Sequence, residues 1–188
     1  MFPLWGLIIG LVVGLIRRGN LVRIAEIPLK AIWLVFAGLF VQLLIFPTPW
    51  SQPPIQVYVE AFHFFSYALI AAFFVLNWRV WELWAMAAGM GLNAIVITIN
   101  RGFMPSSADA LAAAGRVAAA EALRTPPYIH ANTVLMSDQT QLNFFGDWMF
   151  VPSWVPLANA FSIGDLTLMF GLAWLIQAAM CRKTDSSV

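Results

Sequence analysis

Five apolar stretches constrain this chain more than any other feature of its sequence. A hydrocarbon core of about 30 Å needs roughly 20 mostly apolar helical residues, and each stretch meets or approaches that length. The predicted spans are residues 2–16, 31–46, 55–76, 80–99 and 158–180. The chain is 61% hydrophobic and 10% charged, against about half and about a quarter in an average soluble domain. The sequence therefore predicts an all-α integral membrane protein with one membrane domain, residues 1–188.

A long polar segment, residues 100–157, separates the last two predicted spans. Ser106 and Ser107 offer a helix cap ahead of Asp109, so we expect a helix over the alanine-rich residues 110–124. Because that stretch has few large apolar residues, it is expected to lie on the membrane surface. Residues 128–154 alternate polar and aromatic side chains, which indicates irregular or short β structure over the helix ends.

The basic residues sort by side of the membrane when the N-terminus is placed outside. Cytoplasmic loops carry an excess of Lys and Arg, so the richer side is the inner one. Inside would lie Arg17, Arg18, Arg23, Lys30, Arg79, Arg182 and Lys183; outside would lie Arg101, Arg116 and Arg124. The segment 100–157 is therefore expected outside and the C-terminus in the cytoplasm, with the lipid bilayer as the first partner.

Tryptophans near the ends of the predicted spans are typical of interfacial belts. Near the inner ends lie Trp78, Trp81 and Trp84; near the outer ends lie Trp5, Trp50, Trp148 and Trp154.

Charge and cysteine content exclude other classes of protein. A formal net charge of +1 leaves no basic face for a nucleic acid. The single cysteine, Cys181, allows no internal disulfide and no cysteine-pair metal or haem motif. No motif in the sequence identifies a cofactor.

Several polar residues within or beside the predicted spans need an explanation, because ionisable groups in a bilayer are costly. Glu60 and His63 lie in the first turns of the third span, and Asp165 about seven residues into the fifth. Asn93 and Asn100 share a face of the fourth span. With Asp147 in the outer segment, most of these groups are expected to converge at the outer side.

Each candidate also has a structural interpretation. Asp165 can be a buried acid hydrogen-bonded across helices, and Asn93 can join two helices. The i, i+3 spacing of Glu60 and His63 occurs in di-metal helical bundles, but such a site needs a second pair and further carboxylates, so no metal is predicted. His63 could also bind haem, although the other histidine, His130, lies in the loop.

The glycines at positions 6, 10 and 14 give the first span a small-residue face. Such a face suits close helix contact, within the chain or between chains.

Three elements carry a family resemblance: Asn100-Arg101-Gly102-Phe103-Met104-Pro105, then Gly146-Asp147, then Ser162-Ile163-Gly164-Asp165. They resemble the N-x-G-x-M-P, G-D and S-I-G-D elements of an uncharacterised family of small bacterial multi-pass membrane proteins. The resemblance covers the chain from about Gly89 onward. It implies a bacterial inner (plasma) membrane location and no known activity.

A more local resemblance is to lipoprotein signal peptidase, a membrane aspartyl protease. Phe161, Gly164, Asp165 and Gly171 match the spacing of its last helix, and Asp147 in Phe145-Gly146-Asp147-Trp148 is similar to its other catalytic acid. Ser162 stands where that family has asparagine, and its G-N-x-x-D-R element is absent. The resemblance implies a dyad in which one acid keeps a proton while the other activates water.

Three functions follow as hypotheses. The first, which we favour, is a non-catalytic accessory subunit of a larger membrane complex, with other membrane subunits as partners. The second is an aspartyl protease using Asp147 and Asp165. The third is a small transporter or lipid-handling protein in which Glu60, His63 and Asp165 relay protons or ligand.

Overall fold

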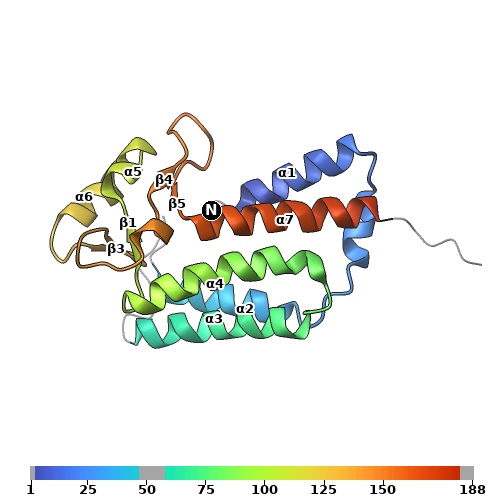
Figure 1. The fold of residues 1–188 in the computed structure, drawn as a ribbon, viewed down its shortest axis with the longest axis horizontal. Helices are drawn as coiled ribbons and strands as arrows, with labels where there is room; N and C mark the ends of the chain where they lie inside the picture. The colour runs from blue at the N-terminus through green and yellow to red at the C-terminus, as the bar shows by residue number, and fades with distance from the viewer. Residues whose placement is uncertain (1–2, 47–57, 183–188) are drawn as a thin grey trace, which may run out of the picture.

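Five long helices lie side by side along the longest dimension of the molecule (Figure 1). The computed structural model describes residues 3–46 and 58–182. The long helices are α1 (Pro3–Ile16), α2 (Trp33–Ile45), α3 (Val59–Leu76), α4 (Trp84–Ile99) and α7 (Ile163–Cys181). The short helices η1 (Leu21–Glu26) and η2 (Trp81–Leu83) lie in the connections at the end where α7 finishes.

Two of these helical segments, Trp81–Ile99 and Ile163–Cys181, are long and apolar enough to cross a membrane. The helices α1, α2 and α3 are also apolar, but their apolar segments are shorter than these two. By length and composition alone, this finding supports membrane association only weakly.

The predicted helix positions agree with the structure except at the start of the last one. The first four predicted stretches correspond to α1, α2, α3 and η2 with α4. The predicted residues Phe2 and 55–57 lie outside the described residues, as do Trp50 and Lys183. The prediction that the last helix begins at Ala158 is wrong, because residues 160–161 form a strand and α7 begins at Ile163. Asp165 therefore lies in the first turn of α7, not seven residues into it.

Glycines let α7 pack closely against a helix on each side. A Cβ atom on Gly10 of α1 would lie 2.8 Å from the carbonyl oxygen of Ala173, and one on Gly89 of α4 would lie 2.5 Å from that of Gly164. Such distances leave no room for a side chain, so the glycines set the helix separation. The small-residue face of α1 is therefore used within the chain. The hairpin of α2 and α3 joins these helices through Leu34, Phe73, Leu83 and Leu175.

Residues 100–162, which we call the cap, cover one end of the helices (Figure 1). A three-stranded sheet contains β1 (Met104–Ser106), β2 (Ile129–His130) and β3 (Thr133–Leu135). Its order is β1-β3-β2, with β1 and β3 parallel and β2 and β3 antiparallel. Beyond the short helix η3 (Asn143–Phe145), β4 (Met149–Phe150) pairs antiparallel with β5 (Ala160–Phe161). Short β structure in residues 128–154 is thus confirmed.

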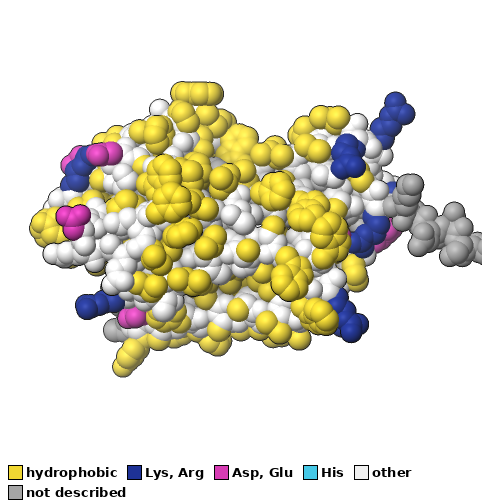
Figure 2. All heavy atoms as spheres, in the orientation of Figure 1, with side chains coloured by type: hydrophobic (Ala, Val, Ile, Leu, Met, Phe, Trp, Pro, Cys, Tyr) yellow, Lys and Arg dark blue, Asp and Glu magenta, His cyan; other side chains and the backbone are white. Residues whose placement is uncertain are grey.

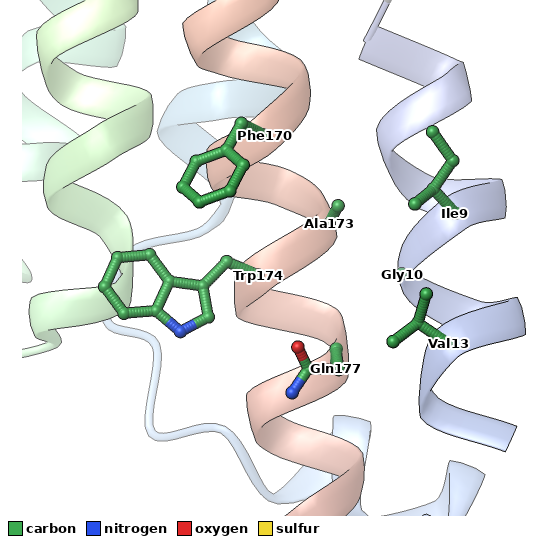
Figure 3. A pocket seen from close by; sticks show the side chains of 7 residues that line it. All are labelled: Ile9, Gly10, Val13, Phe170, Ala173, Trp174 and Gln177. Carbon is green, nitrogen blue, oxygen red and sulfur yellow. The ribbon is translucent and has the colours of Figure 1, made fainter. Parts of the chain in front are cut away.

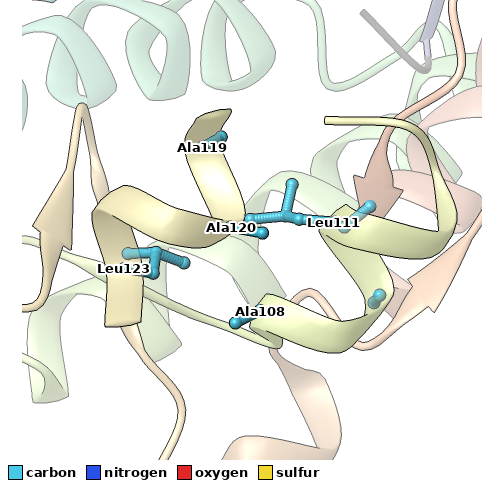
Figure 4. Packing of buried hydrophobic residues seen from close by; sticks show 7 residues of the cluster. Ala108, Leu111, Ala119, Ala120 and Leu123 are labelled. Atoms are coloured by element: carbon cyan, nitrogen blue, oxygen red, sulfur yellow. The ribbon is translucent and has the colours of Figure 1, made fainter. Parts of the chain in front are cut away.

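The prediction of one helix over residues 110–124 is wrong. Two helices occur, α5 (Ala108–Ala113) and α6 (Val117–Arg124), because Gly115 adopts a φ of +75° that ends the first. The predicted cap is present, since the Ser107 side chain accepts a hydrogen bond from the backbone N–H of Ala110. Leu111 and Leu123 are buried where α5 and α6 pack together (Figure 4), so this apolar face forms the core of the cap.

Charged side chains gather at the two ends of the molecule, and hydrophobic side chains cover the flank between them in the view of Figure 2. Arg17, Arg79 and Arg182 follow the helix ends opposite the cap, and Arg101, Arg116 and Arg124 belong to the cap. The exposed tryptophans also lie toward the ends: Trp33, Trp78, Trp81 and Trp84 opposite the cap, Trp148 and Trp154 on it.

Candidate functional site

The first turn of α7 is built around a reciprocal pair of hydrogen bonds. The Ser162 hydroxyl accepts from the backbone N–H of Asp165 at 3.0 Å, and Oδ2 of Asp165 accepts from the backbone N–H of Ser162 at 3.2 Å. This capping box satisfies two N–H groups that would otherwise have no partner at a helix start. Asp165 is therefore part of the structure that begins α7.

Asn93 ties this turn to α4. Its Nδ2 donates to Oδ1 of Asp165 at 3.0 Å, and its Oδ1 accepts from the Ser162 hydroxyl at 2.9 Å. Gly164 makes the approach possible, because a Cβ atom there would collide with Oδ1 of Asn93. Asn93 thus joins two helices and uses both ends of its amide, as the interhelical interpretation expects.

Asp147 is held beside this turn by its backbone. Its N–H donates to the carbonyl of Pro105 at 2.8 Å, and its carbonyl accepts from the N–H of Ser107 at 2.9 Å. The antiparallel pairing of Met149 with Phe161, extended by two residues, brings Asp147 alongside the start of α7. The cap strands therefore bring the loop aspartate to the helix aspartate.

The side chain of Asp147 has a different environment from that of Asp165. Its Oδ1 is buried and makes no hydrogen bond to the described residues. Ser106 pairs with Asp147 through the backbone, and its hydroxyl is likewise buried without a hydrogen bond to the described residues. Burial and, next, the charge of Asp165 raise the pKa of Asp147 to about 8. No hydrogen bond joins the two carboxyl groups in the described part of the chain.

Glu60 and His63 contact a different part of the cap. His63 is buried, forms a hydrogen bond with the backbone of Gly102, and packs against the rings of Phe46 and Tyr67 at 4.8 and 5.1 Å. Glu60 is exposed, and its Cγ would lie 3.1 Å from a Cβ on Gly102, which has a φ of +92°. The two side chains share one face of α3, as their spacing predicts, and that face contacts the turn at Gly102 of the cap.

Asn100 ends α4 and holds the cap loop. Its amide donates to the carbonyls of Val96 and Gln141 at 2.8 and 2.9 Å, and its oxygen accepts from the N–H of Gln141 at 2.8 Å. Although Asn93 and Asn100 are seven residues apart on one helix, their side chains bond to different partners.

These residues fall within a region that a family model matches. The model, described as a family of unknown function (DUF5317), matches residues 26–177. The chain belongs to this family. No curated protein and no solved structure matches the chain. The DUF5317 match runs from η1 into α7, so it contains all six candidate residues predicted from the sequence.

The structure of this DUF5317 chain thus groups the six candidates in three places. Asn93, Asp165 and Asp147 lie around the start of α7, Glu60 and His63 lie against Gly102, and Asn100 binds Gln141. Tyr67 lies within electrostatic range of both aspartates. Among the described residues, no group of three or more His, Cys, Asp and Glu could hold a metal ion.

Ser162, Ser106 and Tyr67 belong to this DUF5317 site and were not among the predicted site residues. For Ser162 a signal existed, because S-x-x-D before an apolar run is a capping pattern. Nothing local in the sequence indicates the other two.

Two hollows lie away from Asp147 and Asp165. One, of about 910 Å³, lies over the cap end of α4 and includes Asn100, Arg101, Tyr128 and Asp138 in its wall. The other, of about 280 Å³, lies between α1 and α7 (Figure 3). Neither is lined by Asp147 or Asp165.

Proposed function

We propose that this chain is a five-span protein of a bacterial plasma membrane and a non-catalytic accessory subunit of a larger membrane complex, such as a bioenergetic one. The spans are α1, α2, α3, η2 with α4, and α7. Two segments of sufficient length, and three shorter apolar helices beside them, support the span count. The basic residues opposite the cap support a cytoplasmic C-terminus and an outer N-terminus and cap.

One observation carries the subunit proposal: Asn93, Ser162 and Asp165 at the start of α7 are hydrogen-bonded to one another. Both oxygens of Asp165 accept hydrogen bonds, from Asn93 and from the backbone of Ser162, and Asn93 is bonded at both ends of its amide. A general acid or base needs free access to the proton that it transfers. This cluster instead holds two helices together beneath the cap, so function is assigned to the surface of the molecule.

The cap offers a surface that suits a protein partner. Several of its large apolar side chains are exposed, Trp154 at 82% and Phe144 at 64%. Exposed apolar side chains gathered in one region often mark an interaction site. The others are Val117, Tyr128, Ile129, Leu142, Trp148 and Phe150.

Purification from native membranes in a mild detergent tests the proposal. We expect stoichiometric membrane subunits, identified by mass spectrometry, and we expect Asp165→Asn to retain them. Trp154→Gln should lower their recovery by about fivefold, because tryptophans dominate interface energies. Asp138→Asn is the control, at an exposed cap residue whose side chain makes no hydrogen bond to the residues that the structure describes. A protein that elutes without partners contradicts the proposal.

A second candidate, an aspartyl protease acting on membrane-anchored peptides, is favoured by Asp147. Its buried, unpartnered oxygen and its raised pKa of about 8 give one acid that keeps a proton near a second acid, Asp165. That division of roles is what a carboxylate pair needs to activate water.

Two variants test the protease candidate. Asp147→Asn and Asp165→Asn should each abolish cleavage of a membrane-anchored peptide substrate while the protein elutes as a folded species. Absence of cleavage by the wild-type protein over a panel of such peptides, or cleavage that either variant retains, contradicts it.

A further inference from the structure

One amide inside the long helices lacks a partner. Among the described helices α1, α2, α3, α4 and α7, three residues carry side-chain amides: Gln42, Asn93 and Gln177. Gln42 donates to the Ser66 hydroxyl at 3.2 Å, and Asn93 is bonded as described above. The Gln177 side chain makes no hydrogen bond to any residue that the structure describes.

Gln177 lies at the edge of the hollow between α1 and α7 (Figure 3). The rest of the wall is apolar or aromatic: Ile9, Gly10, Val13, Phe170, Ala173 and Trp174. An amide in such surroundings has no protein partner, and hydrocarbon chains cannot supply a hydrogen bond. The groove therefore leaves room for an occupant that brings a polar group to the depth of the half-buried Gln177.

The amide belongs to an open stripe on α7. Phe170, Trp174, Gln177 and Cys181 follow one another at spacings of four, three and four, so they share one helix face. Phe170 is 61% exposed, and Trp174, Gln177 and Cys181 are half-buried, so α1 and α4 leave this face only partly covered. Trp174 is fixed from the side by Trp81, with ring centroids 4.5 Å apart.

We propose that this stripe pairs with the same stripe of a second copy of the chain, with the two Gln177 amides hydrogen-bonded to each other. An amide both donates and accepts, so it is its own complement across a two-fold axis. An axis along the membrane normal places both copies of Gln177 at one depth, about 6 Å before the end of α7. The proposal rests on the membrane-spanning arrangement of the proposed function and names one partner of the subunit.

Cys181 provides the test, because it is the single cysteine and lies one turn beyond Gln177 on the same stripe. Copper phenanthroline added to membranes takes two electrons from the two thiols, which lose two protons and form one disulfide between copies. We expect a species of twice the chain mass in the wild-type protein. Gln177→Leu should lower its yield about fivefold, since one interhelical polar contact is lost. Gln177→Asn, which keeps an amide, should lower it less.

The control moves the thiol to another lipid-facing helix. Cys181→Ser combined with Leu43→Cys, at a 60% exposed position of α2, should give no cross-linked dimer. Far-UV circular dichroism checks that the Gln177→Leu protein remains helical. We expect that it does, because leucine favours helices and suits an apolar face.

Three results overturn the dimer: no cross-linked species in the wild type, an undiminished yield with Gln177→Leu, or a species whose mass includes a different chain. The last would leave the accessory-subunit proposal standing. A Gln177-dependent dimer purified without other subunits would instead remove that proposal and leave the dimer.

Discussion

At the scale of residues, two aspartates show how surroundings decide the role of one chemical group. Asp165 lies where backbone and amide donors point at both of its oxygens, so it organises the start of α7. Asp147 is buried with an oxygen that no described group satisfies. Burial disfavours a charge that lacks donors, so the protonation of Asp147 changes near neutral pH.

Asp147 makes the stability of the protein depend on pH. Its pKa rises from an ordinary 3.8 to about 8 on folding, so between these values the folded state binds more protons than the unfolded state. This contribution to stability is complete below pH 4 and is lost as the pH rises toward 8. Asp147→Asn, always neutral, should raise the unfolding temperature by about 3 °C or more at pH 8 and flatten its decline. Thermal unfolding in detergent between pH 4 and pH 9 measures both; an identical pH profile for the two proteins contradicts the prediction.

Ser162 should be the costliest hydroxyl to remove. Ser162→Ala deletes the acceptor for the Asp165 N–H and the donor to Asn93, so we expect a loss of about 1–3 kcal/mol. That loss corresponds to a fall of about 3–10 °C in Tm. Ser153 is an exposed cap serine whose side chain makes no hydrogen bond within the described part of the chain, so Ser153→Ala should leave Tm unchanged. Equal effects of the two substitutions would show that the cluster carries no stability.

At the scale of elements, apolar length predicts which segments are helical, and local hydrogen bonding decides where they end. Residues 158–162 are apolar enough to extend α7, but the capping box at Ser162 and the pairing of β5 with β4 fix a later start. One glycine, Gly115, divides the alanine-rich segment into α5 and α6. The capping pattern at Ser162 and the glycine at position 115 are local signals that the sequence contains.

Long-range pairing could not be predicted in the same way. The hydrogen bond between Asn93 and Asp165 joins residues 72 positions apart. The parallel pairing of β1 with β3 joins two segments whose sequences contain no signal for that pairing. The gathering of the polar candidates at the cap end of the helices follows from the order and direction of the helices, which the sequence predicts. Side-chain packing separates these candidates into two groups, the carboxylates near α7 and the contact of Glu60 and His63 with Gly102. The sequence does not predict that packing.

Two glycines of α4 provide a matched test of helix packing. Gly89→Ala places a Cβ 2.5 Å from the Gly164 carbonyl oxygen, so we expect α4 and α7 to separate at a cost of about 1–3 kcal/mol. Gly91→Ala, with open space around the new Cβ, should be neutral or slightly stabilising. Denaturation of both variants measures the difference, and a Gly89→Ala protein as stable as Gly91→Ala would refute the close contact.

At the scale of the whole molecule, an apolar helical body separates two ends of different composition. The cap has its own small core of alanine and leucine, and the opposite end carries arginines on short connections. Both the proposed accessory function and the proposed dimer require that this body crosses the membrane five times, with the cap outside.

Labelling of single cysteines from one side of the membrane tests that arrangement most directly. In a Cys181→Ser background, Asp138→Cys reports on the cap and Arg79→Cys on the connection between α3 and η2. With a membrane-impermeant maleimide on intact cells, we predict labelling of Asp138→Cys at once and of Arg79→Cys only after the membrane is opened. Labelling of both positions from the same side, or recovery of the protein in the soluble fraction, would contradict the five-span arrangement.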